Sequence, residues 1–230
     1  MEDHFKLYSE AAHRYQELVS YEDAQNQLTK TLLSHVNFEG PGVIEAGVGT
    51  GRVTELYAHR AQQIYAYDQS SHMINYARQR FTNYDHIQYA VKHHTDLLEQ
   101  IPAAHLLIEG WAFGYWFLEL FPNFETCLDP YFTQLKRALQ SPAQIVLIET
   151  LGTNCEQPFQ DQPLNIFYDY LENQQGFQRH VLRTDYQFPS RDKMIELMGF
   201  FFGAEMSQQL QTQQMLTVPE WTGCWIWNAS

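Results

Sequence analysis

The sequence predicts an α/β protein: a three-layer α/β/α sandwich around a Rossmann-like, seven-stranded, mostly parallel sheet whose last strand is antiparallel. Short apolar runs alternate with stretches of helical periodicity along most of the chain. One run ends in a glycine-rich turn at 47–51, the usual opening of a doubly wound sheet. Another, at 143–149, is almost continuously apolar, which is typical of a central parallel strand buried on both faces. A length of 230 residues, with 44% hydrophobic residues, suits one domain with a sizeable core.

We expect a single domain over residues 1–230, in which residues 1–36 form a helical N-terminal extension that caps the sheet. An apolar residue recurs there at every fourth position and gives one apolar stripe: Ala24, Leu28, Leu32 and Val36. An aromatic-rich segment that includes Tyr15 precedes this stripe. That segment either packs against the domain or forms a lid.

The first predicted strand begins at Val43 and ends at an acid, Glu45. Glycines at 47, 49 and 51 follow, and they allow the backbone to turn sharply and to approach a ligand without a Cβ in the way. Residues 52–61 are then predicted to be a helix. The dinucleotide fingerprint G-x-G-x-x-G needs a glycine where Arg52 stands, and no P-loop sequence is present.

The second predicted strand, 64–68, also ends at an acid. That acid, Asp68, lies about twenty residues past the glycines, where a ribose-binding carboxylate belongs in this architecture. A helix that carries Met73 and Ile74 on one face follows it. The third strand is expected within 86–97, and the sequence Thr95-Asp96-Leu97 closes that segment.

The second half continues the alternation of strands and helices. We expect strands at 105–109, 143–149, 179–188 and 213–227, and helices at 130–139 and after the N-cap Ser190. The aromatic segment 110–117 reads as a loop, and the aromatic residues of 221–227 as an edge strand.

The net charge, the apolar runs and the cysteine content limit the kinds of partner that we expect. The net charge of −13 repels nucleic-acid phosphates, so we expect no nucleic-acid partner; the acidity either aids solubility or steers a cationic substrate. Because no long apolar run and no apolar signal segment occur, we expect a cytoplasmic protein without a membrane partner. Three separated cysteines and the absence of H-E-x-x-H argue against a metal site, and His93 and His94 are not assigned as ligands.

The pattern E-x-G-x-G-x-G at 45–51 resembles motif I of the class I S-adenosylmethionine-dependent methyltransferases, and D-x-S-x-x-M-I at 68–74 looks like their second motif. The resemblance extends from about residue 38 to about residue 203 and implies S-adenosylmethionine as the cofactor. IVLIETLGTN (145–154), RTDYQFPS (183–190) and FFFG (200–203) are similar to an uncharacterised bacterial subgroup of this family.

The resemblance also implies the cofactor contacts. The glycine turn would hold the methionine part, Asp68 the ribose hydroxyls, and Asp96 the adenine amino group. The full expected set, to which Tyr15 is added from its place in the extension, is Tyr15, Glu45, Gly47, Gly49, Gly51, Asp68, Gln69, Met73, Thr95, Asp96 and Leu97.

The acceptor is expected to approach above the carboxyl ends of the fourth and fifth strands. No catalytic residue is assigned, and the candidates are Glu109, Trp111, Tyr115 and Glu149, with Trp116 and Thr150 nearby. The aromatic residues there either contact substrate or serve as core or lid. Members of the family that methylate amino groups of bases or glutamine carry [D/N]-P-P-[Y/F] where this chain has Glu109-Gly110-Trp111-Ala112, and the cysteine pairs expected for arsenic methylation are absent.

We therefore predict methyl transfer to an oxygen or nitrogen of a small-molecule acceptor. A non-catalytic S-adenosylmethionine-binding regulatory module is the alternative. A nicotinamide-dependent oxidoreductase is disfavoured by Arg52 and by the lack of a Tyr-x-x-x-Lys pair. The sequence does not predict an oligomeric state.

Overall fold

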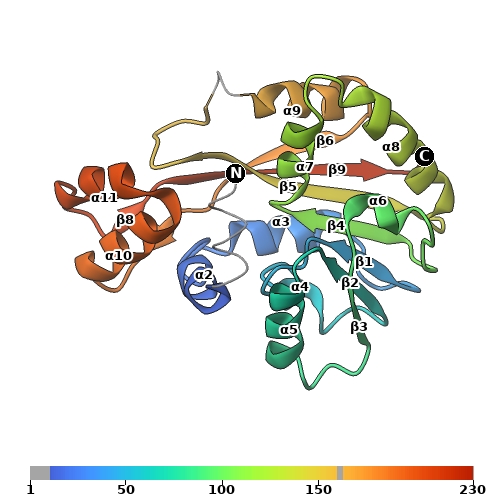
Figure 1. The fold of residues 1–230 in the computed structure, drawn as a ribbon, viewed down its shortest axis with the longest axis horizontal. Coiled ribbons are helices and arrows are strands. Elements are labelled where there is room, and N and C mark those ends of the chain that lie inside the picture. Colours follow the sequence, from blue (N-terminus) through green and yellow to red (C-terminus); the bar gives the residue numbers. More distant parts are fainter. Residues whose placement is uncertain (1–10, 160–162, 230) are drawn as a thin grey trace.

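The computed structural model describes residues 11–159 and 163–229 and has a seven-stranded sheet at its centre, in the order β3-β2-β1-β4-β5-β9-β6 (Figure 1). The strands are β1 (Val43–Ala46), β2 (Ile64–Asp68), β3 (Ile87–Val91), β4 (Leu106–Gly110), β5 (Gln144–Thr153), β6 (Gln178–Arg183) and β9 (Glu220–Asn228). The first five strands in this order are mutually parallel, and β9 runs antiparallel to both of its neighbours. This confirms the predicted fold class.

Helices cover both faces of the sheet because successive side chains of each buried strand point to opposite sides. Ile44 and Leu107 join one core with α6 (His94–Leu97), α7 (Phe113–Leu120), α8 (Glu125–Ala138) and α9 (Leu164–Asn173). Val43 and Leu106 join the other core with α3 (Gln27–His35), α4 (Thr54–Tyr57) and α5 (Ser71–Arg80). The first of these cores is rich in stacked rings, among them the pair Phe113 and Phe167.

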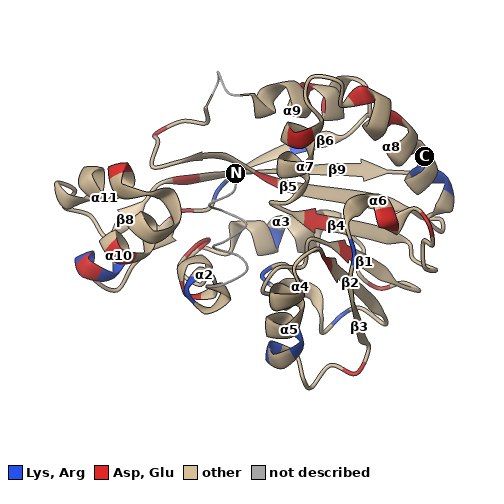
Figure 2. Cartoon of the chain, in the orientation of Figure 1, with Lys and Arg blue, Asp and Glu red and all other residues tan. Residues whose placement is uncertain are grey.

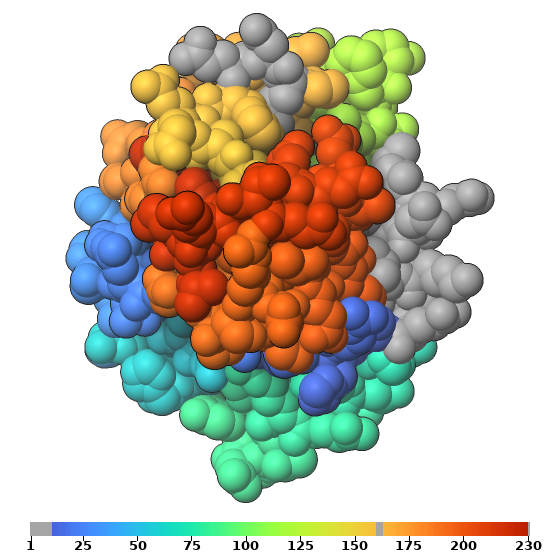
Figure 3. Space-filling view, turned by 90° about the vertical axis from the view of Figure 1, so that its left-hand side faces the viewer, coloured from blue at the N-terminus to red at the C-terminus, as the bar shows by residue number. Residues whose placement is uncertain are grey.

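A third apolar cluster lies beyond the carboxyl ends of the parallel strands. It joins α2 (Ala12–Val19), β7 (Tyr186–Gln187), α10 (Arg191–Phe202), α11 (Ala204–Gln211) and β8 (Thr217–Val218). We call these five elements the cap. Figure 1 shows them on the left, the side toward which β4 points, and Figure 3 shows α10 and α11 in orange above the blue α2. Leu18 of α2 is buried against Met194 and Leu197 of α10.

The described part of the N-terminal extension contains two helices, α2 and α3. They are separate because the chain turns at 20–26, where Asp23 and Asn26 have positive φ angles. The Asp23 carboxylate accepts hydrogen bonds from the backbone amides of Gln27 and Leu28 and so begins α3. The apolar stripe consequently starts at Leu28, and Ala24 is exposed. The assignment of 1–230 to one domain stays a prediction, and residues 1–10 lie outside the described residues.

Three segments have other structures than predicted. The aromatic segment 110–117 is mostly the helix α7, because Phe113 and Phe117 are one helical turn apart and both face the core. The aromatic residues 221–227 belong to β9, which is not an edge strand: it lies between β5 and β6. The helix predicted at 52–61 is reduced to the single turn of α4. Within the described residues no helix is both long enough and apolar enough to cross a membrane.

Candidate functional site

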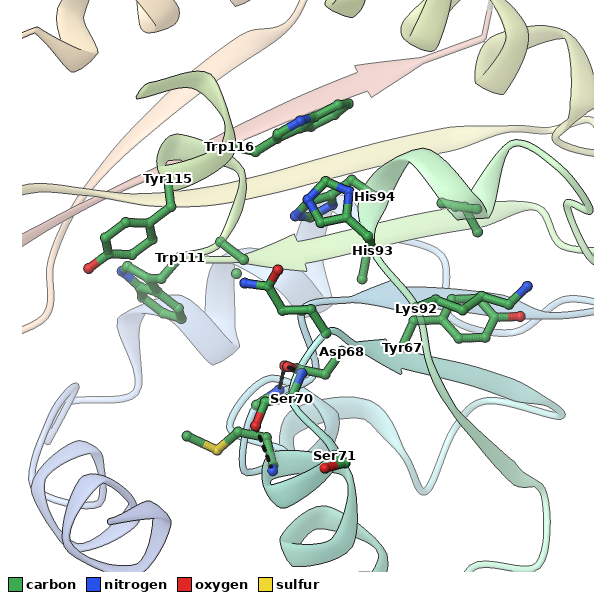
Figure 4. Close-up of a pocket in the computed structure, with 18 of the residues that line it drawn as sticks. Tyr67, Asp68, Ser70, Ser71, Lys92, His93, His94, Trp111, Tyr115 and Trp116 are labelled. Atoms are coloured by element: carbon green, nitrogen blue, oxygen red, sulfur yellow. Dashed lines mark hydrogen bonds between the residues drawn. The ribbon is translucent and has the colours of Figure 1, made fainter. Parts of the chain in front are cut away.

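A cavity of about 750 Å³ opens at the carboxyl ends of β1, β2 and β4 (Figure 4). Its volume lies in the range of small-molecule and cofactor sites, roughly 300–1,000 Å³. The glycine turn, the start of α5, the segment after β3 and the aromatic side chains around α7 form its walls. Of the predicted cofactor residues it is lined by Tyr15, Gly47, Gly49, Asp68, Gln69, Met73 and Leu97.

Asp68 ends β2 with its carboxylate held in a fixed orientation. One oxygen, Oδ2, accepts a hydrogen bond from the Gly49 amide at 2.8 Å, and Oδ1 accepts one from the Ser70 amide at 2.8 Å (Figure 4 shows the latter). A carboxylate offers about four lone-pair positions, so each oxygen can accept one donor more. Burial raises the pKa of Asp68, and these two amide hydrogen bonds oppose that rise. The side chain is therefore pre-organised to accept two hydroxyl groups from the cavity side.

Two glycines of the turn serve different ends. Gly49 has a φ of 53°, and a Cβ built on it would meet nothing within 4 Å, so its side of the turn faces open space. Gly51 has a φ of 84°, and a Cβ there would lie 2.2 Å from Cε2 of Phe81. Gly51 thus packs the turn against the end of α5 and does not line the cavity.

Glu45 lies beneath the turn rather than in the cavity. Its carboxylate is buried and accepts hydrogen bonds from the Thr54 amide at 3.2 Å, the Thr54 hydroxyl at 2.7 Å and the Tyr57 hydroxyl at 2.6 Å. Burial raises the pKa of Glu45 to about 7, against the effect of these donors. Its acceptor capacity is used in fixing α4 under the glycines, which makes it a support of the turn.

The segment after β3 presents histidines to the cavity where the sequence predicted Thr95 and Asp96. Asp96 accepts a hydrogen bond from the His93 amide at 3.0 Å, and the His93 ring accepts one from the Thr95 amide at 3.3 Å. This reciprocal capping turns the Asp96 carboxylate toward the backbone. His93 and His94 line the cavity, and Thr95 and Asp96 do not.

His94 is a half-buried, neutral imidazole. Its ring stacks on Trp116 with centroids 5.1 Å apart, and burial, followed by the neighbouring His93, lowers its pKa to about 3. Its Nδ1 is enclosed and has no hydrogen-bond partner among the residues described. The tandem histidines gave no motif signal, so the sequence alone could not assign this place to them. In the described part of the chain, no group of three or more metal-ligating side chains occurs.

Solved structures of low sequence identity share this fold. DhpI in complex with SAH is 15% identical to this chain, with 97% of this chain and 95% of that chain covered and a TM-score of 0.56. Haemonchus contortus phosphoethanolamine N-methyltransferase 2 is 13% identical, with 97% and 58% covered and a TM-score of 0.57. Precorrin-6y C5,15-methyltransferase from Geobacter metallireducens GS-15 is 12% identical, with 88% of each chain covered and a TM-score of 0.55. No curated protein matches the sequence.

A family model described as "Methyltransferase domain" matches residues 43–141, from β1 to just past α8. The chain therefore carries a methyltransferase domain over residues 43–141, in a fold that solved methyltransferases share. These matches support the predicted class I S-adenosylmethionine-dependent family, enzyme class and cofactor. The narrower similarity to a bacterial subgroup stays a prediction.

The residues of the first cavity fit this cofactor. An oriented carboxylate at the end of β2 and an open glycine beside it are what a ribose and its attached chain require. The cofactor supplies the reaction with a methyl group already activated by a sulfonium. The methyltransferase itself must then align the acceptor and exclude water.

The acceptor candidates separate into two groups around a second cavity of about 260 Å³. Trp111 and Tyr115 line both cavities, Glu149 and Thr150 line the second, and Trp116 lines the first. Glu109 lines neither. The two cavities therefore adjoin at Trp111 and Tyr115, above the ends of β4 and β5.

Trp111, at the junction of the two cavities, has an unusual backbone conformation. Its φ is 57°, which is uncommon for a residue with a side chain and concentrates at functional sites. The Arg52 guanidinium stacks on its ring, 3.4 Å from the centroid, and forms an ion pair with the buried Glu22. Arg52, which the sequence offered only as a departure from the dinucleotide fingerprint, thus joins the glycine turn to the segment between α2 and α3.

Glu109 and Glu149 both bind the amino end of α7. Oε1 of Glu109 accepts hydrogen bonds from the amides of Ala112 and Phe113, and Oε1 of Glu149 accepts one from Gly114 at 2.6 Å. Burial raises the pKa of both carboxyls, to about 8 for Glu149, and the nearby Glu149 raises that of Glu109 further. Glu109 is enclosed beneath the helix, whereas Glu149 also reaches the second cavity.

Proposed function

We propose that this methyltransferase binds S-adenosylmethionine in the first cavity and transfers its methyl group to a nitrogen or oxygen of a small molecule. The observation that carries the proposal is the carboxylate of Asp68, oriented by the amides of Gly49 and Ser70 toward a cavity wide enough for a nucleoside. A bidentate acceptor in this place is well shaped for the two ribose hydroxyls.

The proposed contacts follow the lining of the first cavity. Gly47 and Gly49 take the methionine part, Met73 and Leu97 pack against the adenine, and Gln69 lies at its edge. Tyr15 of α2 covers the methionine end. In place of Asp96, we assign the neutral His94 to the polar edge of the adenine, because its enclosed Nδ1 has no partner among described residues.

Two neighbours in the fold support a small acceptor. The Haemonchus contortus enzyme is described in complex with phosphomonomethylethanolamine and S-adenosylhomocysteine, and DhpI in a complex with SAM and HEP. Each of these complexes is thus described with a second ligand in addition to the cofactor or its product. The second cavity of this chain, about 260 Å³, lies just below the usual range of ligand sites and therefore suits only a small molecule.

Calorimetric titration with S-adenosylhomocysteine tests the cofactor site. Asp68→Ala should weaken binding roughly tenfold or more, because hydrogen bonds to a charged group contribute about 1.5–3 kcal/mol each. Asp68→Asn should also weaken binding, since its amide nitrogen opposes one of the two backbone donors. Glu39→Gln, an exposed acid before β1, is the matched control and should bind like the wild type. Unchanged affinity in Asp68→Ala would reject the ribose contact.

Turnover separates transfer from binding alone. Incubation with S-adenosylmethionine and a panel of small amines, phenols and carboxylates, followed by mass spectrometry, should reveal an acceptor that gains one methyl group. A protein that binds the cofactor and methylates none of the three classes would instead behave as a regulatory module.

A further inference from the structure

The second cavity is enclosed by parts of the chain that are far apart in sequence. β5 and β9 form its floor with Glu149 and Glu220, the cap covers it with Phe201, and Glu22 and Arg52 close one side. Figure 2 shows acidic residues within β5 and β9 beside the cap, where these strands run on past β4. Aromatic rings and aliphatic side chains make up most of the remaining walls, and Trp111 and Tyr115 line the junction with the first cavity.

Carboxylates outnumber cations in this cavity. Among the described residues that line it, three glutamates face a single guanidinium, and that guanidinium is already engaged by Glu22 and by the Trp111 ring. Removal of a charge from water costs several kcal/mol unless a partner compensates it. Among the described residues no ion pair reaches Glu149 or Glu220, and the charge of Arg52, already paired with Glu22, is the cation that acts on Glu220.

The hydrogen bonds of these carboxylates are also incomplete. Oε1 of Glu220 accepts from the Thr150 hydroxyl at 3.1 Å, but its Oε2 is buried without a partner in residues 11–159 and 163–229. Oε2 of Glu22 is likewise buried and has no hydrogen-bond partner among the described residues. Both side chains are more than nine-tenths buried. Such acceptors are ordinarily satisfied in a folded protein, so each points to a donor that the described residues do not supply.

The chemistry of the walls disfavours two acceptor classes. An anionic acceptor would find no free guanidinium among the described residues of this cavity, because Arg52 is engaged by Glu22. A neutral acceptor would leave Glu22, Glu149 and Glu220 in the buried surroundings that raise the pKa of each, whereas a bound cation stabilises their charged forms. A cation with N–H donors satisfies both the charge and the hydrogen bonds, and the faces of Trp111 and Phe201 favour a cation or an apolar body beside it.

We propose that the second cavity binds the methyl acceptor, and that this acceptor is a small amine, bound as its ammonium ion through Glu149 and Glu220 with its apolar body against the aromatic wall. This deepens the proposed function and rests on it. The acceptor atom is then nitrogen rather than oxygen.

Glu149 takes the proton that the reaction must remove. An ammonium nitrogen has no lone pair, so one N–H proton passes to the Glu149 carboxylate before transfer. The freed lone pair forms the bond to the methyl carbon while the carbon–sulfur pair stays on sulfur, and the methylated nitrogen carries the positive charge away. The position of Glu149 suits this role. Its Oε1 accepts a hydrogen bond from the Gly114 amide, and Gly114 precedes Tyr115, which lies at the junction of the two cavities. Its pKa, raised by burial to about 8, suits a proton acceptor near neutral pH.

Matched probes test the proposal on the intact protein saturated with S-adenosylhomocysteine. The probes are benzylamine, phenethylamine and butylamine. Each is compared with two analogues, one in which a hydroxyl group and one in which a carboxylate group replaces the amino group. Calorimetry should show the amines binding at least tenfold more tightly than the alcohols, and the carboxylates not binding. Glu220→Gln and Glu149→Gln should each lower the preference for amines several-fold and leave the affinity for S-adenosylhomocysteine within about twofold.

The control Glu39→Gln should keep the preference for amines, and thermal unfolding should show that all variants are folded. Alcohols or carboxylates that bind as well as the amines, or no binding by any amine, would overturn the proposal. So would an amine preference that survives in both Glu149→Gln and Glu220→Gln. Failure of the proposed function is distinguishable, because S-adenosylhomocysteine would then not bind in the first titration.

Discussion

Buried carboxyl groups at the ends of neighbouring strands have distinct roles, and their hydrogen-bond donors decide which. Glu45 accepts hydrogen bonds from Thr54 and Tyr57, and Oε1 of Glu109 accepts them from the amino end of α7, so both hold the backbone around the site. Oε2 of Glu109 is enclosed beneath the helix without a partner among the described residues. Asp68 is oriented by two amides yet keeps acceptor capacity toward the first cavity. Glu149 keeps one oxygen on Gly114 and lines the second cavity.

The raised pKa of Glu149 predicts how stability depends on pH. Because burial raises its pKa from 4.5 to about 8, the stability that its protonated form contributes is fully present below pH 4.5 and is lost as pH rises to 8. Glu149→Gln keeps the neutral form at every pH. The free energy of unfolding of the wild type, measured by urea denaturation, should therefore fall relative to that of the variant, by up to about 1.4 kcal/mol per pH unit. If the free energies of unfolding of the wild type and Glu149→Gln change in parallel between pH 5 and 8, the raised pKa of Glu149 is contradicted. The free energy of unfolding of the control Glu39→Gln should follow that of the wild type at every pH.

The place of Asp68, Gly47 and Gly49 beside the first cavity was predictable, because their spacing along one strand–turn–helix unit is local. The sequence misplaced Asp96, whose carboxylate turns to the His93 amide, because a capping interaction competes with a ligand for the same oxygens. It also missed Glu22 and Glu220 entirely. These two residues meet only through the folding of the cap over the strand ends, and no spacing in the sequence records that.

At the scale of elements, the glycine turn that follows β1 packs against the end of α5 on one side and borders the first cavity on the other. The ring of Phe81, just after α5, occupies the place where a Gly51 side chain would stand. Arg80 at the end of α5 donates hydrogen bonds to the carbonyls of Thr50 and Gly51, both at 3.2 Å. The turn is thus held from the α5 side and left open only at Gly49.

Gly51→Ala should destabilise the protein by more than its backbone conformation alone requires. A left-handed residue with a Cβ costs roughly 1–2 kcal/mol, and forced overpacking adds roughly 1–3 kcal/mol. Gly176→Ala is the matched control, because its φ of 76° is similar and a Cβ there meets nothing within 4 Å. Urea denaturation should show the larger loss for Gly51→Ala, partly restored when Phe81→Leu is added. An equal loss of unfolding free energy in the two alanine variants would mean that the Phe81 ring can move aside without destabilising the protein.

Elements were predictable where burial leaves a periodic pattern in the chain. The parallel strands read as apolar runs, and the Ser190 cap of α10 is confirmed by its hydrogen bond from the Lys193 amide at 3.2 Å. α7 was not predicted because its sequence, FGYWFLEL, is apolar on nearly all sides and carries no helical alternation. The position of β9 between β5 and β6 was not predictable either, since pairing between strands so distant in sequence leaves no local signal.

At the scale of the whole molecule, the cap is attached to the sheet through the site. Gln16 of α2 accepts a hydrogen bond from the Thr50 hydroxyl of the glycine turn at 2.6 Å, and Glu22 pairs with Arg52 just after that turn. Tyr15 of the same helix lines both cavities. A ligand in the first cavity therefore contacts the sheet and the cap together, and its binding should restrain the cap.

Hydrogen exchange should detect this restraint. α2 has eight residues and no side-chain cap at its start, so its amides are expected to exchange by local opening. Saturation with S-adenosylhomocysteine should slow exchange across α2 and the turn at 47–51, because the bound state adds contacts to Tyr15 and Gly49. The edge strand β6, which lines neither cavity, is the internal control and should exchange at an unchanged rate. Asp68→Ala should abolish the slowing at the same ligand concentration. Equal protection of α2 and β6 would indicate only a general stabilisation, and no protection of α2 would show that the cap does not contact the cofactor.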